Sequence, residues 1–129
     1  MKILSEISAG ELLDKITILE IKMDKIKNED DKKEVLREYK SLKKTQKENI
    51  KFNEEIKKLY DELKQTNSKL WEIEDKLRIL EKEKKFDNDF IELARGVYFN
   101  NDDRSKIKLK INKLLKSNIR EIKQYVEYN

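Results

Sequence analysis

Charged side chains that interrupt apolar helix faces are the residues of this chain most suited to chemistry. Glu74 and Glu81 break a line of apolar residues at three/four spacing, and Arg78 lies four residues after the first and three before the second. All three side chains can therefore meet on one helix surface. A guanidinium group is a planar donor that binds a carboxylate or a phosphate through two parallel hydrogen bonds.

Polar residues also interrupt two other apolar faces. Asn101, Arg104 and Lys108 form a polar island between apolar stretches of a later helix, and Lys15 and Glu20 flank the apolar face of the first one. Burying an unpaired charge is costly, so a charge on a packing face needs a partner. The same kind of interruption on three helices indicates either an internal ion network or a binding site.

Two interpretations of these charges stay open. In the first, the residues 74–81 charges form an ion network with Arg95 and Lys15 that fixes the helix register, as polar residues inside bundles commonly do. In the second, the acids satisfy only part of the bases and an anionic ligand completes the set. The first is favoured. The candidate ligand-binding residues are Lys15, Glu20, Glu74, Arg78, Glu81, Arg95, Asn101, Arg104 and Lys108.

The composition excludes several kinds of active site. The chain has no histidine and no cysteine, which removes the commonest general base, the thiolate nucleophile and the usual zinc and di-iron ligands. We therefore predict no catalytic residue, no cofactor and no metal. Acids three apart, at 11 and 14 and at 72 and 75, have the spacing of a magnesium-dependent pyrophosphatase, but their order and separation do not fit that class.

Long amphipathic helices must position these side chains. Charged residues make up 45% and hydrophobic residues 36% of the 129 residues, with no proline and two glycines, and the leucines and isoleucines recur periodically. We predict one all-α domain over 1–129, an elongated antiparallel bundle of three to four helices in which a coiled-coil-like hairpin packs against the first helix. The helices are expected at about 8–27, 31–48, 53–84 and from 87 or 89 to about 116, with 119–129 undecided.

Several features of the charge and the apolar residues bear on partners. Residues 104–123 hold eight Lys or Arg and one Glu, a net charge of +7, and we favour a solvated face over a nucleic-acid site there. Trp71 is expected to fill the core rather than to stack on a base. No run approaches the ~20 apolar residues of a membrane span, and residues 1–10 lack the apolar core of a signal peptide. A cytoplasmic location is the expectation.

Four stretches of the chain together form a recognisable pattern. They are EISAGELLDKITILEIK at 6–22; Asn67, Leu70, Trp71, Ile73, Glu74 and Asp75; Phe86, Asp87, Phe90, Ile91, Ala94, Arg95, Val97 and Tyr98; and Asn101, Asp102, Arg104, Ile111 and Asn112. With this pattern the chain resembles a family of short bacterial proteins known only as a domain of unknown function. The resemblance covers nearly the whole chain, implies no activity, and implies an association with surface-polysaccharide and glycosyltransferase genes.

The sequence leads to two classes of function. The first is a non-enzymatic helical interaction or accessory protein that forms a homodimer or binds another protein, and it is favoured over an enzyme. The alternative is a protein that binds a small anion or a sugar nucleotide, or a helical enzyme. The segment ELLDKI at 11–16 is similar to the opening helix of all-helical chorismate mutases, which implies electrostatic catalysis by Lys15, Arg78, Arg95 and Arg104.

Overall fold

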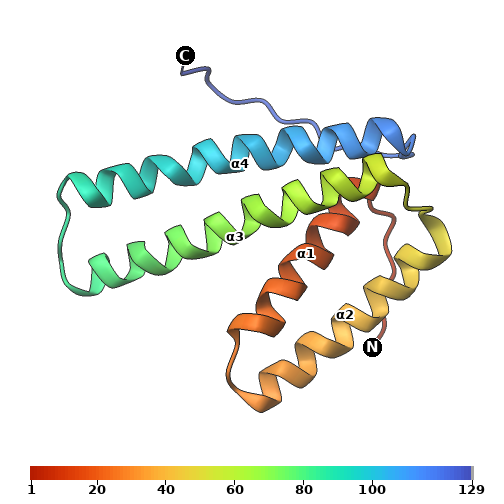
Figure 1. Cartoon of the computed structure of the whole chain (residues 1–129), viewed down its shortest axis with the longest axis horizontal. Coiled ribbons are helices and arrows are strands. Elements are labelled where there is room, and N and C mark those ends of the chain that lie inside the picture. The colour runs from red at the N-terminus through yellow and green to blue at the C-terminus, as the bar shows by residue number, and fades with distance from the viewer. Residues whose placement is uncertain (129) are drawn as a thin grey trace.

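A computed structural model describes residues 1–128 of the chain, and these residues form four helices and no strand. The helices are α1 (Ala9–Lys25), α2 (Glu29–Asn49), α3 (Glu54–Lys82) and α4 (Asn88–Leu114). Figure 1 shows α3 and α4 as a long antiparallel hairpin and α1 and α2 as a shorter one that crosses one end of it. The predicted all-α bundle is confirmed.

Each helix begins at a side-chain cap that accepts a hydrogen bond from a first-turn amide. Ser8 accepts from the Glu11 N–H at 3.1 Å, and Asn53 and Asp87 cap α3 and α4 in the same manner. The second helix begins at Glu29, two residues before the predicted start at about residue 31, because Asn28 caps it. The acidic residues that follow Asn28 lie in the first turn of α2, where they complement the helix dipole.

The helix ends also refine the predicted boundaries. The break expected near 49–52 is present, since residues 50–53 separate α2 from α3. Both Lys84 and Lys116 adopt a positive φ, of 57° and 50°, where the chain leaves α3 and α4. Of the stretch 119–129, which the sequence left undecided, residues 119–128 form no helix, and residue 129 lies outside the described residues. None of the helices in residues 1–128 has the length and apolarity needed to cross a membrane.

The core lies around α1, which contacts all three other helices. Among the helices, α2 packs on α1 alone, and Gln46 is its one buried residue. A helix that is apolar on more than one side must bury more than one side, and α1 does so because its apolar residues spread around the helix. The buried apolar cluster consists of Leu12, Leu13, Ile16, Ile56, Leu59, Leu63, Ile107 and Ile111.

Burial divides the α3–α4 hairpin into two halves. The buried residues of α3 end at Asn67, and those of α4 begin at Ile107. We call the part under α1 the proximal half, and residues 70–100 the distal half. Over most of the distal half no third helix lies against the two helices (Figure 1), although Tyr128 of the C-terminal segment contacts the rings of Tyr98 and Phe99 on α4. They approach closely at Gly96, where an added Cβ would lie 3.1 Å from Cδ1 of Ile73.

Candidate functional site

A buried carboxylate of α1 lies at the centre of the proximal half. Asp14 is 1% exposed. Arg104 of α4 binds it through two hydrogen bonds, from Nε to Oδ1 at 2.9 Å and from Nη2 to Oδ2 at 2.5 Å. The ammonium of Lys108, one turn further along α4, lies 3.4 Å from Oδ2. The planar fork of Arg104 therefore meets the carboxylate in the geometry that an arginine–carboxylate pair prefers.

Neutral polar groups complete the surroundings of this carboxylate. The side-chain amide of Asn67 on α3 donates to Asp14 Oδ1 at 2.8 Å and to the Thr17 hydroxyl oxygen at 2.9 Å. The Thr17 hydroxyl in turn donates to the backbone carbonyl of Asp14 at 2.7 Å. We call Asp14, Thr17, Asn67, Arg104 and Lys108 the central cluster. It joins α1, α3 and α4.

The central cluster holds its charges in their ionised forms. Burial raises the pKa of the Asp14 carboxyl, but the hydrogen bonds from Arg104 and Asn67 and the positive charges of Arg104 and Lys108 outweigh burial, so this pKa lies below its ordinary value. Burial lowers the pKa of Lys108, whereas the hydrogen bond to Glu11 and the charges of Asp14 and Glu11 raise it above its usual range. Asp14 and its two cationic partners therefore stay charged at neutral pH.

Arg104 and Lys108, the two bases of this cluster, are both paired with acidic side chains. Besides Asp14, Lys108 pairs with Glu11 at 2.7 Å and with Glu121 of the C-terminal segment at 3.4 Å. Arg104 also donates from Nη1 to the Asn101 side-chain oxygen at 3.3 Å. Glu11 and Glu121 pair with Lys15 and Lys123 as well, so three carboxylates are shared by four cations. The central cluster is an ion network that joins α1, α3 and α4, and each of its charged side chains has a partner of opposite charge.

A groove next to the central cluster contains charged side chains that make no ion pair within residues 1–128. It has a volume of ≈ 540 Å³ and lies between α1, α3 and α4. Glu74, Asp75 and Arg78 are exposed on it, and none of the three makes an ion pair within residues 1–128. Trp71 is half-buried in its wall. The groove is lined by Ile18, Ile21, Asn67, Leu70, Trp71, Glu74, Asp75, Arg78, Asn101 and Arg104.

The structure brings four of the nine predicted site residues to this groove. They are Glu74, Arg78, Asn101 and Arg104. Asn101 and Arg104 also border a smaller polar pocket of ≈ 200 Å³, which contains Lys108 as a further predicted residue. Trp71 lines the groove, so the expectation of a core filler is only half met.

The predicted ion network of residues 74–81 with Arg95 and Lys15 does not form in the described residues. Arg95 pairs with Glu92 at 2.9 Å, Glu81 with Lys84 at 3.8 Å, and Lys15 with Glu11 at 3.8 Å. Each of these pairs is three or four residues apart on one helix or its end. The prediction was wrong because helical phase does not specify which helix faces another, and these side chains point outward.

The similarity to chorismate mutases implied that Lys15, Arg78, Arg95 and Arg104 surround one substrate. The structure does not bring all four residues to the groove. Arg78 and Arg104 line the groove, whereas Arg95 contacts Glu92 and lies over the Phe99 ring, 5.3 Å from its centroid. The arrangement therefore offers one unpaired guanidinium, that of Arg78, together with a second one that is bound to Asp14.

Glu20 belongs to a second polar group on the other side of α1. Its carboxylate accepts hydrogen bonds from the hydroxyls of Tyr39, at 3.2 Å, and Tyr60, and pairs with Lys64 at 3.5 Å. Burial, the hydrogen bond to Glu20 and its charge raise the pKa of Tyr60 far above the ordinary value. This group fastens α2 and α3 to α1, away from the groove.

Comparison with known proteins places the chain in a family. Residues 1–128 match the Family of unknown function (DUF6165). The chain belongs to this family. No curated protein and no solved structure gives a significant match to it. The resemblance to a domain of unknown function is thereby confirmed, and the family membership itself assigns no activity.

Asp14, Thr17 and Asn67 of the central cluster, and Trp71 and Asp75 of the groove, were absent from the predicted site. The sequence of this DUF6165 protein did contain a signal for Asp14 and for Asn67. Asp14 lies between Leu13 and Ile16, two fully buried residues of α1, and an acid in that position must find a cation. Asn67 interrupts the apolar face of α3 as Glu74 does, but about two turns closer to the core.

Metal binding finds little support in the described part of this DUF6165 protein. Within residues 1–128 no group of three or more acidic side chains is arranged to hold a metal ion. The carboxylates of Glu11 and Asp14 already face Lys108 and Arg104. Of the pair at 72 and 75, only Asp75 lines the groove.

Proposed function

We propose that this DUF6165 protein binds a small polar ligand, which carries an anionic group and a ring, in the groove between α1, α3 and α4. One observation carries the proposal: Arg78 is exposed and without an ion-pair partner in residues 1–128, beside Trp71 and in a groove of ≈ 540 Å³. That volume is typical of small-molecule sites, which are about 300–1,000 Å³.

Each groove residue would contact a different part of such a ligand. Arg78 supplies a planar fork for a phosphate or carboxylate. Trp71 offers an aromatic surface for a ring. Glu74 and Asp75 are acceptors for ligand hydroxyls. Arg104 is held by Asp14 and acts as a positioning residue that fixes this wall of the groove.

A phosphorylated sugar or a sugar nucleotide combines these features. It has an anionic group for Arg78, hydroxyls for the two acids and a ring for Trp71. The resemblance to proteins encoded near polysaccharide genes favours the same class, and a cytoplasmic location fits it, because activated sugars are made there. Binding without catalysis is the proposed activity, since the groove offers a positive charge and acceptors but no histidine or cysteine.

Trp71 provides a direct test because it is the one tryptophan of the chain. Intrinsic fluorescence would be titrated with UDP-glucose, glucose 1-phosphate, inorganic phosphate and glucose. We expect saturable changes with the two phosphorylated sugars and little with glucose. Arg78→Ala should lower the affinity at least about tenfold, since a hydrogen bond to a charged group contributes about 1.5–3 kcal/mol.

The matched control is Arg37→Ala, because Arg37 is an exposed arginine of α2 far from the groove lining. It should bind like the wild type. No saturable change with any of the four probes, or equal affinities of the Arg78 variant and the wild type, would overturn the proposal. Response to inorganic phosphate alone would reduce the site to an anion site without a sugar subsite.

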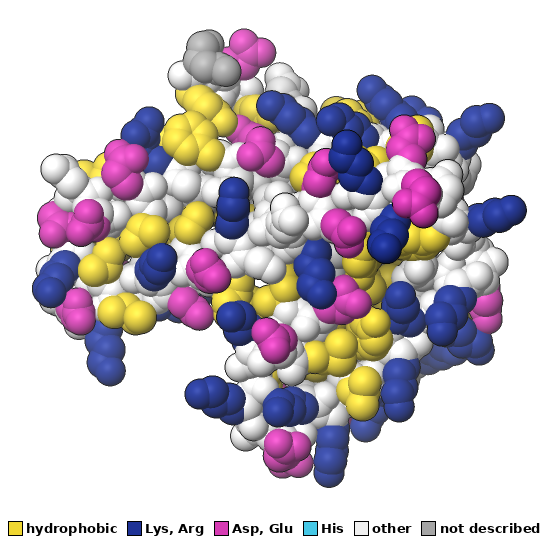
Figure 2. All heavy atoms as spheres, viewed as in Figure 1, with side chains coloured by type: hydrophobic (Ala, Val, Ile, Leu, Met, Phe, Trp, Pro, Cys, Tyr) yellow, Lys and Arg dark blue, Asp and Glu magenta, His cyan; other side chains and the backbone are white. Residues whose placement is uncertain are grey.

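The second candidate is the helical interaction protein, and the distal half of the hairpin favours it. Its apolar side chains are well exposed, with Ile79 at 55%, Phe86 at 52% and Ile91 at 50%. Figure 2 shows apolar side chains between the charged ones over this half. Because α1 and α2 leave it uncovered, its surface is available to a partner.

A further inference from the structure

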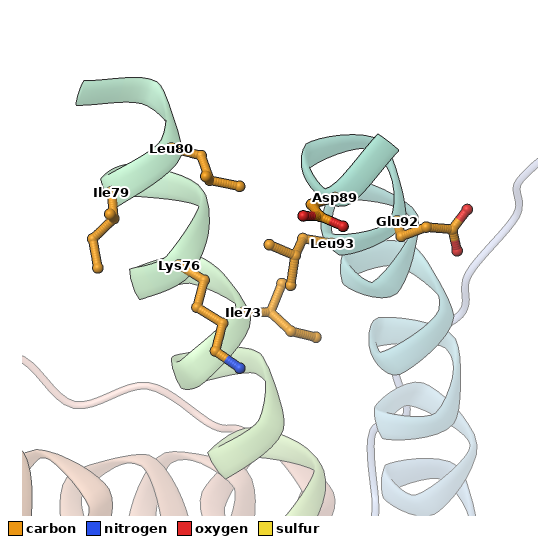
Figure 3. Close-up of a pocket in the computed structure, with 7 residues that line it drawn as sticks. All are labelled: Ile73, Lys76, Ile79, Leu80, Asp89, Glu92 and Leu93. Atoms are coloured by element: carbon orange, nitrogen blue, oxygen red, sulfur yellow. The ribbon is translucent and has the colours of Figure 1, made fainter. Parts of the chain in front are cut away.

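An apolar groove separate from the ligand groove lies on the distal half of the hairpin (Figure 3). It has a volume of ≈ 530 Å³, and no residue lines both grooves. Ile73, Ile79 and Leu80 of α3 and Leu93 of α4 form its apolar part. Ile79 is 55% exposed. A patch of this kind on an uncovered helix pair is typical of an interaction surface.

The two edges of this apolar groove carry opposite charges. Lys76 lies on the α3 side, and Asp89 and Glu92 lie on the α4 side (Figure 3). Within residues 1–128, Lys76 and Asp89 make no ion pair, while Glu92 pairs with Arg95 of its own helix. One face therefore has a basic edge, an apolar centre and an acidic edge.

We infer that a second copy of this chain packs on this face, hairpin against hairpin. A two-fold axis along the groove places α3 of each copy over α4 of the other, since a two-fold contact uses the same patch twice. The basic edge of each copy then meets the acidic edge of the other, and the apolar centres meet between them. The surface is complementary to itself.

The architecture of the distal half also points to a second copy. Helical domains are built from packed layers that bury an apolar face on each side. Under α1 the hairpin has such a covering layer, whereas no other helix lines the apolar groove of the distal half. The C-terminal segment contacts the distal half at Tyr98 and Phe99, which do not line this groove. Two distal halves together make four antiparallel-paired helices around one apolar centre, which is the arrangement of a four-helix bundle.

Sedimentation velocity of the full chain over a wide concentration range tests this inference. We expect a reversible monomer–dimer equilibrium. Ile79→Asp should raise the dissociation constant at least about 30-fold, because it places a charge at the apolar centre of the contact. The matched control is Ile91→Asp, since Ile91 is similarly exposed at 50% on α4 but does not line the groove. The control should dimerise like the wild type.

Charge reversal at the edges gives a second test that leaves the apolar residues unchanged. Lys76→Glu alone, and Asp89→Lys with Glu92→Lys, should each weaken the dimer severalfold through like-charge contacts. The combination of all three changes should restore it, because the edges are then reversed together. These three residues are exposed, so the outcome stays informative even if Ile79→Asp unfolds the chain, which circular dichroism would show.

Several results would overturn the inference. A wild-type chain that stays monomeric at every concentration excludes a second copy, and capture of a different protein on this face by the monomer would support another occupant. A dimer that survives Ile79→Asp, or charge reversals whose combination restores nothing, would place the contact elsewhere. Ligand binding by the monomer is independent of all these results, because the two grooves share no residue.

Discussion

The two halves of the α3–α4 hairpin differ in whether an arginine near an apolar helix face has an ion-pair partner. In the proximal half, Arg104 interrupts an apolar face and is bound to Asp14 under the cover of α1. In the distal half, Arg78 lies between Glu74 and Glu81, which interrupt an apolar face, but it is exposed and makes no ion pair within residues 1–128. A charged side chain stabilises the fold where it is bound to a buried partner on another helix, and it is available to a ligand where it is exposed and unpaired in the groove between α1, α3 and α4.

Removal of Arg104 should give the largest effect. Arg104→Ala leaves the carboxylate of Asp14, 1% exposed, with only Lys108 and Asn67 around it. Loss of one partner of a buried pair costs about 3–5 kcal/mol. Urea denaturation followed by circular dichroism measures this loss. Replacing both partners, as Asp14→Leu with Arg104→Met, should recover part of it, and a loss no larger than that of Arg37→Ala would show that the pair adds nothing.

Acid should remove part of the same stabilisation. The pKa of Asp14 is lower in the folded chain than the ordinary value, which is about 3.9 in an unfolded chain. The unfolded state therefore binds this proton first, so the contribution is complete above about pH 4 and is lost as the pH falls through the folded pKa. Urea denaturation at successive pH values should show this loss. Asp14→Asn lacks the titrating group, and an equally steep acid dependence in that variant would assign the effect to other carboxyls.

The two glycines give a further contrast between the halves. A Cβ on Gly10 would lie 2.6 Å from the backbone oxygen of Lys108 and 2.9 Å from Asn112 Oδ1, whereas one on Gly96 would meet only the mobile end of Ile73 at 3.1 Å. Overpacking costs about 1–3 kcal/mol, so Gly10→Ala should lower the free energy of unfolding by that amount. Gly96→Ala should change it little, because two effects oppose each other. Alanine favours a helix by up to about 1 kcal/mol over glycine, and the tight contact with Ile73 offsets this gain. Equal losses in thermal unfolding would contradict the contrast.

A feature of this structure could be predicted from the sequence when the residues that form it lie close together in the chain. The sequence predicted caps at Ser8, at Asn53 and at either Asp87 or Asp89, and Ser8, Asn53 and Asp87 are the observed caps, because a cap depends on residues within one turn. The partner of Arg104 was missed because Asp14 lies 90 positions away. Periodicity gives the face of a helix on which a residue lies, but the crossing of α1 over the hairpin decides which faces meet.

The smallest stability effect is expected at Arg78, and it separates the two halves most directly. Arg78 is exposed and has no ion pair to lose within residues 1–128, so Arg78→Ala should leave the free energy of unfolding within about 0.5 kcal/mol of the wild type. The same urea measurement used for Arg104→Ala provides the comparison. A loss of several kcal/mol would mean that Arg78 is a structural residue like Arg104. An unchanged stability together with loss of the Trp71 response to phosphorylated sugars would assign the distal charge to binding and the proximal one to folding.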